Sequence, residues 1–277
     1  MPCVTPAARP EAEYEPEMTV LDSSNLIVRR AKRDILDQVS LHAESGDFIA
    51  VIGANGAGKS TFLSVLAGLL KPDAGTVRLD GDSIWDLSPL ELARRRAYLP
   101  QNPRCEWPIS VERLVALGLT PTLPAFGGLP KAYGSRITQA LEAFDLLERR
   151  GQPATTLSGG ELARAMLARA LVGDPDILIV DEPIAGLDPK HAFDTARRLQ
   201  GLARAGKIVI ASMHDLTLAA RYSNRILALG TGRVQGDGPT EVTLTPALIR
   251  SAFDVDARIS GQHEDACVNY LHPLDPI

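Results

Sequence analysis

The sequence predicts an α/β fold: a mixed β-sheet with flanking helices, an antiparallel β subdomain and an inserted α-helical lobe. Three observations lead to this prediction. Short apolar runs with the length of buried parallel strands recur at 48–52, 177–180 and 208–211. Segments with the apolar spacing of helices alternate with these runs, which favours a sheet with right-handed crossovers. Residues 102–157 show helical patterns only, and we therefore expect them to form the inserted lobe.

Four of the predicted strands lie in the first third of the chain. They are expected over 25–29, 35–42, 48–52 and 76–79. A helix follows the third strand and is expected to reach Leu70, where the sequence Lys-Pro-Asp-Ala-Gly at 71–75 breaks it. Residues 88–91, Ser-Pro-Leu-Glu, form a capping box with proline at the first helical position, which predicts a short helix to about Arg96.

The lobe is predicted from helical periodicity over 110–117 and 135–149, separated by a proline- and glycine-rich stretch at 121–130. A helix is expected after Ser158. The later predicted elements are a strand ending at 181, a helix at 189–205, a strand at 207–213, a helix to about 222, a hairpin around 230–232 and a last helix from 245. The expected boundaries are a disordered tail at 1–18, a single domain at 19–260 and a C-terminal tail at 261–277.

Composition argues against several classes of protein. The net charge of −5 and the isoelectric point near 5.6 argue against a dedicated nucleic-acid binder. Cys3, Cys105 and Cys267 are odd in number and scattered, so neither a zinc site nor a disulfide framework is indicated. No apolar run approaches the ~18 residues that cross a bilayer. Any membrane work is therefore expected from a partner.

A glycine-rich loop follows the strand at 48–52 and opens a helix. It has the pattern G-x-x-x-x-G-K-[ST], in the residues Gly53, Ala54, Asn55, Gly56, Ala57, Gly58, Lys59, Ser60 and Thr61. Glycines let such a loop turn tightly and bring its N–H groups against phosphate oxygens, and the helix adds its positive N-terminal end. We expect Lys59 to reach the β and γ phosphates of a nucleotide and Ser60 to bind Mg²⁺. The core is therefore predicted to be that of a P-loop NTPase.

Two carboxylates follow the apolar strand that starts at residue 177. In an open α/β sheet the carboxyl ends of the strands are where ligands bind. We expect Asp181 to hold Mg²⁺ through water and Glu182 to polarise the attacking water.

A third motif, Leu157-Ser158-Gly159-Gly160-Glu161, lies just before that acidic strand and opens a helix with exposed N–H donors. The phosphate loop, this signature and the acidic strand, in that order, resemble the ATP-binding subunit of an ABC transporter over residues 20–259. Glu161 occupies a position where glutamine is commoner, and Leu162 and Ala163 replace an arginine and a glutamine that often follow.

The resemblance implies that two copies meet head to tail, with residues 158–161 of one copy contacting the γ phosphate of an ATP held by the other. His214 matches a histidine that contacts the γ phosphate, and is counted with Glu182 as catalytic. Gln101 matches a glutamine that binds Mg²⁺ and couples the site to the membrane partner. Asp188 matches the loop that crosses the dimer interface.

Arg30 is a departure from the family pattern, because an aromatic residue usually stacks on adenine at this position. A guanidinium plane can also stack on a base. The alternative is that adenine is held weakly and nucleotide specificity is looser.

Within the family, the chain most resembles importers of iron–siderophore, haem or cobalamin, through residues 111–118 and 244–257. The implied partners are a second copy, a polytopic membrane permease and, indirectly, a substrate-binding protein, with ATP as substrate, Mg²⁺ as cofactor and no nucleic acid. The implied place is the cytoplasmic face of the inner (plasma) membrane, peripheral through the permease. Zinc or manganese uptake and an exporter subunit remain alternatives within the family.

Two further alternatives come from other classes. Soluble ABC ATPases of translation or DNA repair usually fuse two cassettes or contain coiled-coil insertions and basic patches, and this sequence shows none of these. The complete catalytic set argues against a non-hydrolysing regulatory module.

Overall fold

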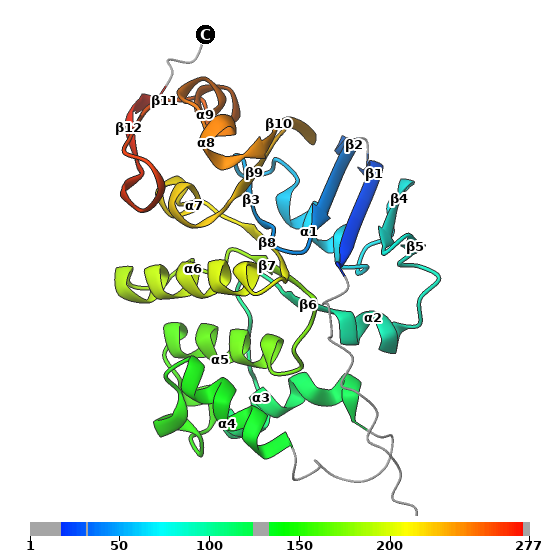
Figure 1. The fold of residues 1–277 in the computed structure, drawn as a ribbon, viewed down its shortest axis with the longest axis vertical. Coiled ribbons are helices and arrows are strands. Elements are labelled where there is room, and N and C mark those ends of the chain that lie inside the picture. Colours follow the sequence, from blue (N-terminus) through cyan, green and yellow to red (C-terminus); the bar gives the residue numbers. More distant parts are fainter. Residues whose placement is uncertain (1–17, 32, 124–132, 274–277) are drawn as a thin grey trace, which may run out of the picture.

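A six-stranded sheet forms the centre of the computed structural model, which describes residues 18–31, 33–123 and 133–273 (Figure 1). The strand order is β10-β9-β3-β8-β7-β6. The strands are β3 (Phe48–Ile52), β6 (Arg96–Leu99), β7 (Ile177–Asp181), β8 (Ile208–Ser212), β9 (Arg225–Gly230) and β10 (Arg233–Pro239). Neighbours are parallel except β9 and β10, which form the predicted hairpin. The sheet is therefore mixed, as predicted.

A second, antiparallel sheet has the order β2-β1-β4-β5. Its strands are β1 (Val20–Arg30), β2 (Arg33–Glu44), β4 (Ala74–Leu79) and β5 (Asp82–Ser83). Helix α1 (Lys59–Leu66) packs between the two sheets, because Phe62 and Leu63 share one buried cluster with residues of β1, β2 and β3. The predicted antiparallel β subdomain is confirmed.

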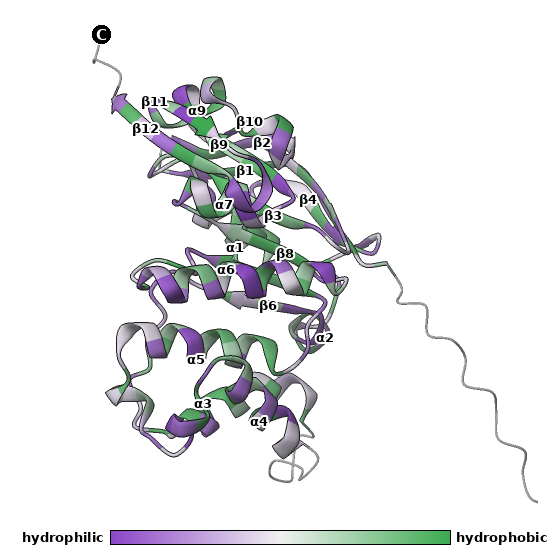
Figure 2. Ribbon diagram, turned by 60° about the vertical axis from the view of Figure 1, so that its left-hand side comes forward, coloured by the Kyte–Doolittle hydropathy of each residue, from purple (hydrophilic) through white to green (hydrophobic). Residues whose placement is uncertain are grey.

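The three central strands are buried along their whole length, which explains their continuous apolar sequences. Successive side chains of a strand face opposite sides of its sheet. In β3, Phe48 and Ile52 join the core beneath helices α6 (Pro189–Arg204) and α7 (Leu216–Tyr222), while Ile49 and Val51 join the core around α1. Figure 2 shows the resulting apolar colouring of β3 and β8.

The helical lobe lies at the lower end of Figure 1, on the other side of α6 from the antiparallel sheet. It contains α3 (Val111–Ala116), η1 (Leu117–Thr122), α4 (Tyr133–Ala143) and the short 3₁₀ turns η2 (Leu147–Arg149) and η3 (Ala154–Thr156). Helix α5 (Gly159–Leu171) packs against α3 and α4 and leads back to the sheet. The expected N-terminal tail and most of the stretch 121–130 lie outside the described residues.

Two predicted helices end earlier than expected. Helix α1 stops at Leu66 because Gly68 adopts a φ of 67° and the Leu69 amide turns back to donate to the Ser64 carbonyl. Helix α4 stops at Ala143, since Asp145 has a φ of 55°. Apolar residues continue past both ends, exposed at Leu69 and buried at Phe144 and Leu146, so periodicity alone did not mark the stops. Helix α2 (Pro89–Arg95) agrees with its prediction.

The C-terminal boundary predicted at 260 falls between two paired strands. Strands β11 (Val255–Ser260) and β12 (Cys267–Pro273) form a hairpin after α8 (Thr240–Thr243) and α9 (Pro246–Phe253), with the 3₁₀ turn η4 (His263–Asp265) between them. Thr217 of α7 exchanges hydrogen bonds with the Val268 backbone. Within the stretch expected as a C-terminal tail, residues 263–265 thus form a 3₁₀ turn and 267–273 a paired strand. Their sequence does not reveal this, because the partners of β12 are supplied by other elements. In the described parts of the chain, no helix is both long and apolar enough to cross a membrane.

Candidate functional site

The glycine-rich loop connects β3 to α1, and its backbone needs glycine at two points. A Cβ on Gly53 would lie 2.1 Å from the Leu229 carbonyl oxygen, and one on Gly58 would lie 2.7 Å from that of Ile35. Gly58 also has a φ of 101°, in the left-handed region. The loop is therefore held closely between β9 and β2, which leaves residues 54–56 exposed at its tip and Ser60 exposed in the first turn of α1.

Lys59 is buried at the base of this loop, with 6% of its surface exposed. Its Nζ donates to the carbonyl oxygens of Gly53 at 2.7 Å and Ala54 at 3.1 Å. Burial lowers the pKa of the Lys59 ammonium, and the nearby carboxylates of Glu182 and Asp181 oppose this shift. The loop thus places one cation beside the two predicted acids.

Asp181 ends β7 and is buried, with 4% of its surface exposed. It accepts a hydrogen bond from the Ser212 hydroxyl, whose oxygen lies 2.5 Å from Asp181 Oδ1. The same Ser212 oxygen accepts from the backbone N–H of Glu182 at 2.8 Å. The sequence analysis did not single out Ser212. Its position between the apolar residues 208–211 and the apolar Met213 was a usable signal. The structure shows that it joins both acids.

Glu182 contacts His214 directly: Oε1 of the glutamate lies 2.7 Å from Nε2 of the histidine. Glu182 has a φ of 52°, so the chain turns sharply immediately after the buried strand. Both residues line a cavity of about 310 Å³ together with Leu187. The structure therefore brings the two residues predicted as catalytic into one hydrogen bond.

Gln101 lies in the exposed turn after β6, next to the strand that bears the acids. Strands β6 and β7 are parallel, with Leu99 opposite Val180. Gln101 and Asp181 therefore both follow paired residues at the same carboxyl edge of the sheet.

The signature begins α5, with Ser158 as its N-cap. Ser158 Oγ accepts from the Glu161 N–H at 3.3 Å, and Glu161 Oε2 accepts from the Ser158 N–H at 2.9 Å, so a capping box is present. Because Gly159 and Gly160 have no side chains, the backbone of the first turn of α5 is left uncovered. A Cβ on Gly160 would lie 3.5 Å from a methyl group of Leu187. No hydrogen bond or ion pair in the described residues joins the signature to the phosphate loop of the same chain.

Asp188 follows Leu187 and caps α6. Its Oδ1 accepts from the His191 N–H at 3.0 Å, and its Oδ2 lies 2.6 Å from His191 Nδ1. These hydrogen bonds hold the pKa of the Asp188 carboxyl below its ordinary value, and the bond from the His191 backbone N–H has the largest effect.

Arg30 is exposed at the end of β1, opposite Arg33 in the register with β2. The same hairpin approaches the phosphate loop, since the carbonyl of Ile35 lies against Gly58. Arg30 is thus on an element that borders the loop.

An α/β core that presents a phosphate loop and paired acids at the carboxyl edge of a mainly parallel sheet is that of a nucleotide-hydrolysing P-loop protein. The family profile described as ABC transporter matches residues 36–185. The chain belongs to this family, and it is an ATP-binding, ATP-hydrolysing cassette.

Relatives in the same family match most of the chain. The hemin import ATP-binding protein HmuV of Nocardia farcinica is 40% identical over 250 residues, which cover 88% of this chain and 85% of the relative. The protein of the same name from a strain of Rhodopseudomonas palustris is 41% identical over 229 residues, covering 80% and 83%.

Two solved structures share the fold. A metal-chelate type ABC transporter in an inward-facing conformation has a TM-score of 0.79 at 22% identity, covering 93% of this chain and 98% of that one. A dimeric ATP-binding cassette in a post-hydrolysis state, bound to ADP and Pi, has a TM-score of 0.72 at 26% identity, covering 79% and 98%.

Proposed function

We propose that this ATPase powers the import of a metal chelate, with haem as the first candidate, through separate membrane subunits. The relatives named for hemin import, which match four fifths or more of each chain, support the cargo class. Iron–siderophore and cobalamin are the neighbouring cargoes suggested by the sequence. The observation that supports the hydrolytic role is the contact of Glu182 with His214 beside Lys59.

The phosphate loop is proposed to hold the nucleotide. Residues 53–61 supply N–H donors and the Lys59 ammonium binds the β and γ phosphates. This requires Lys59 Nζ to exchange its two loop carbonyls for phosphate oxygens. Arg30, at the border of this loop, is proposed to lie against the adenine.

The residues at the carboxyl edge fit Mg²⁺. A hydroxyl from Ser60, a carboxylate from Asp181 and an amide oxygen from Gln101 are the hard oxygen donors that this ion prefers. When bound with ATP, Mg²⁺ neutralises charge on the β and γ phosphates.

Glu182 is proposed to orient and deprotonate the attacking water. Its backbone is held by Ser212 and its carboxylate by His214, so its position is fixed from both ends. The Glu182 side chain is largely buried, with 15% of its surface exposed, while that of His214 is 41% exposed. His214 is proposed to hold the carboxylate and to contact the γ phosphate.

A second copy of the chain is proposed to complete each site. The first turn of α5 exposes the N–H donors of a helix N-terminus, and no hydrogen bond or ion pair among the described residues joins it to the phosphate loop of the same chain. Residues 158–161 of the partner subunit would then meet the γ phosphate, with Asp188 at the interface.

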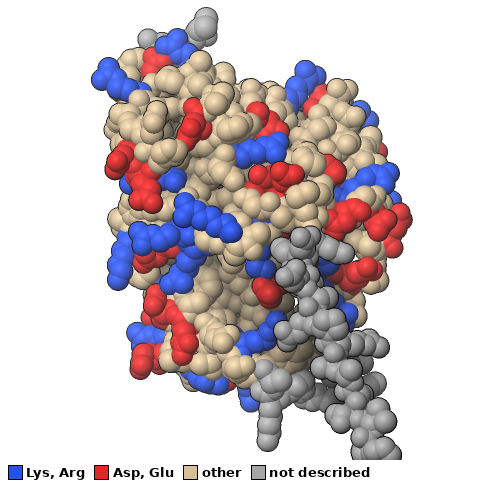
Figure 3. Space-filling model, in the orientation of Figure 1, with Lys and Arg blue, Asp and Glu red and all other residues tan. Residues whose placement is uncertain are grey.

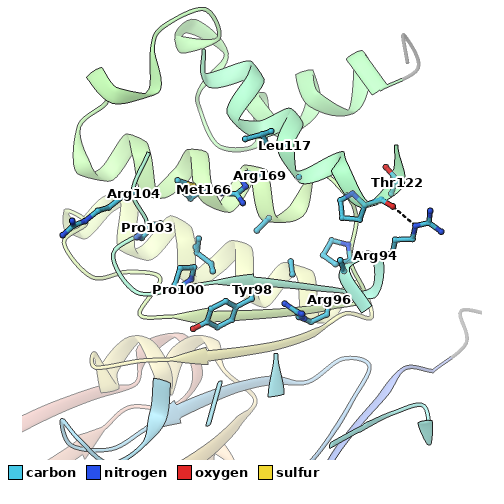
Figure 4. Close-up of a pocket in the computed structure, with 18 residues that line it drawn as sticks. Arg94, Arg96, Tyr98, Pro100, Pro103, Arg104, Leu117, Thr122, Met166 and Arg169 are labelled. Carbon is cyan, nitrogen blue, oxygen red and sulfur yellow. Dashed lines mark hydrogen bonds between the residues drawn. The ribbon is translucent and has the colours of Figure 1, made fainter. Parts of the chain in front are cut away.

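The membrane permease is proposed to dock in a cavity of about 330 Å³ between β6 and the helical lobe, beside Gln101. Figure 4 shows Leu117 and Arg169 across this cavity from Arg96. Arg96 Nε is buried without a hydrogen-bond partner among the described residues. A substrate-binding protein would act on this chain only indirectly, through the permease. The chain itself is proposed to lie at the cytoplasmic face of the inner (plasma) membrane, held there by the permease. The net charge of −5 supports the proposal of no nucleic-acid partner. Figure 3 shows acidic and basic side chains interspersed on the face that it draws.

The test of hydrolysis is Glu182→Gln. We expect this variant to retain ATP binding while steady-state hydrolysis falls by about 10²–10⁴-fold, the usual cost of a lost general base. Light scattering is expected to show dimers of the variant with Mg-ATP and monomers without it. Near-normal turnover would refute the role of Glu182, and a variant that binds ATP yet stays monomeric would refute the two-copy site.

The cargo needs a separate experiment. The chain is reconstituted with its permease and binding protein in liposomes, and uptake of haem, a ferric siderophore and cobalamin is compared. We expect ATP-dependent haem uptake that the Glu182→Gln variant abolishes. If none of the three chelates is taken up, the proposed cargo class is overturned, while the assignment of the chain as an ATPase stands.

A further inference from the structure

We propose that Arg149 is a positioning residue of the signature, which compensates the charge of Glu161 so that this acidic signature can meet the phosphates bound to a second copy. The inference rests on the two-copy site proposed above. It concerns a residue of the helical lobe that none of the three sequence motifs contains.

The observation behind it is that Glu161 uses both carboxylate oxygens. Oε2 accepts from the N–H and the hydroxyl of Ser158, at 2.9 and 2.8 Å. Oε1 accepts from Nε of Arg149 at 3.0 Å. The hydrogen bonds from Ser158, followed by that from Arg149, hold the pKa of the Glu161 carboxyl below its ordinary value. Glu161 is therefore an anion at neutral pH, in contact with the serine that is proposed to face the γ phosphate.

An anion at this position is unfavourable for a phosphate-binding surface. At an effective dielectric constant of about 20, an unpaired carboxylate about 6 Å from a phosphate charge raises the dissociation constant of the dimer by up to about a hundredfold. Glu161 is partly solvated, and salt reduces the effect further, so about tenfold is the reasonable expectation. A cation paired to the carboxylate cancels most of this repulsion.

The hydroxyl of Ser158 adds a second requirement. It has one proton, which it donates to Glu161 Oε2. To donate to a phosphate instead, Ser158 must give up this hydrogen bond. Arg149 lowers the cost of the exchange, because the carboxylate that loses the serine proton keeps its charged partner.

Arg149 is well placed for this role because its backbone is fixed. It ends η2, its N–H donates to the Leu146 carbonyl at 2.9 Å, and its own carbonyl accepts from Gln152 at 2.8 Å. The next residue, Arg150, pairs with Glu112 and Thr138 inside the lobe, and it makes no hydrogen bond or ion pair with the signature among the described residues. The two adjacent arginines therefore provide a matched pair of variants.

The experiment uses the full chain with Glu182→Gln as parent, so that ATP drives dimers without hydrolysis. Calorimetry measures ATP affinity at low protein concentration, and light scattering measures the protein concentration at half-dimerisation. We expect Arg149→Gln to leave the ATP affinity of the monomer unchanged and to raise the half-dimerisation concentration about tenfold. Arg149→Lys is expected to restore most of the loss, since it keeps the charge.

The decisive variant is Arg149→Gln combined with Glu161→Gln. Removing the anion removes the need for its counterion, so the double variant is expected to dimerise within about twofold of Glu161→Gln alone. Arg150→Gln serves as the control, and any defect it causes is not expected to be repaired by Glu161→Gln.

The outcomes separate the two proposals. A parent that dimerises with ATP, combined with an Arg149→Gln variant that dimerises equally well, overturns the role of Arg149 alone. A defect that persists in the double variant does the same, because it shows a structural effect unrelated to charge. A parent that never dimerises overturns the two-copy site, and this inference with it.

Discussion

The Ser212 hydroxyl donates a hydrogen bond to the Asp181 carboxylate, with 2.5 Å between the two oxygens. The two residues lie opposite each other at the ends of the parallel strands β8 and β7. Because the same hydroxyl accepts from the Glu182 N–H at 2.8 Å, one buried side chain sets the position of both acids.

Ser212→Ala is therefore expected to affect the site more than its small volume suggests. It leaves the Asp181 carboxylate and the Glu182 N–H without a partner, which costs about 1–3 kcal/mol of unfolding free energy for each buried group left unsatisfied. We expect a higher Mg²⁺ concentration at half-maximal ATPase activity, and recovery in Ser212→Thr. Urea unfolding and a Mg²⁺ titration measure the two effects. Wild-type values for both in Ser212→Ala would contradict the role of this hydroxyl.

Lys59→Ala is expected to weaken ATP binding itself. The variant removes the cation that the phosphate loop encloses beside Asp181 and Glu182, so phosphates would meet two carboxylates without compensation. Calorimetry with ATP is the measurement. Lys207→Ala is a suitable control, because Lys207 pairs with Asp174 away from the loop. Unchanged ATP affinity in Lys59→Ala would show that the loop does not use this ammonium.

Arg30→Ala is expected to weaken ATP several-fold and tripolyphosphate much less. The reason is that stacking of a cation on a π face contributes roughly 0.5–2 kcal/mol, and only ATP has a base. Both affinities are measured by calorimetry. Arg33→Ala, at the opposite position of the hairpin, controls for the loss of a positive charge. Equal losses for both ligands would exclude stacking.

The capping box of α5 is expected to be sensitive to acid. The folded pKa of Glu161 lies below its ordinary value of 4.5, first because of the hydrogen bonds from Ser158. A lowered folded pKa gives a contribution to stability that is complete above the unfolded pKa and is lost as pH falls through the folded pKa. The difference in unfolding free energy between wild type and Glu161→Gln is therefore expected to be constant at about pH 7 and to shrink below the ordinary value of 4.5. Urea unfolding over this range checks it, and a difference independent of pH would contradict it.

Several elements could not be predicted, and the reason differs from one to another. Strand β6 is short and only partly buried, so its sequence lacks the apolar run that marked β7 and β8. Strand β12 exposes most of its residues and depends on β11 and α7 for its position. The ends of α1 and α4 depend on the left-handed backbone at Gly68 and Asp145.

The candidate site was predicted in its parts but not in its connections. Local sequence determined the phosphate loop, the buried strands and the capped start of α5, because glycine conformations, continuous burial and N-cap hydrogen bonds depend on residues close together in the chain. Only the tertiary structure decided that His214 contacts Glu182, that Ser212 joins the two acids and that Arg149 pairs with Glu161. These contacts connect residues 12 to 32 positions apart. They arise from strand register and from the packing of the lobe, which no local pattern specifies.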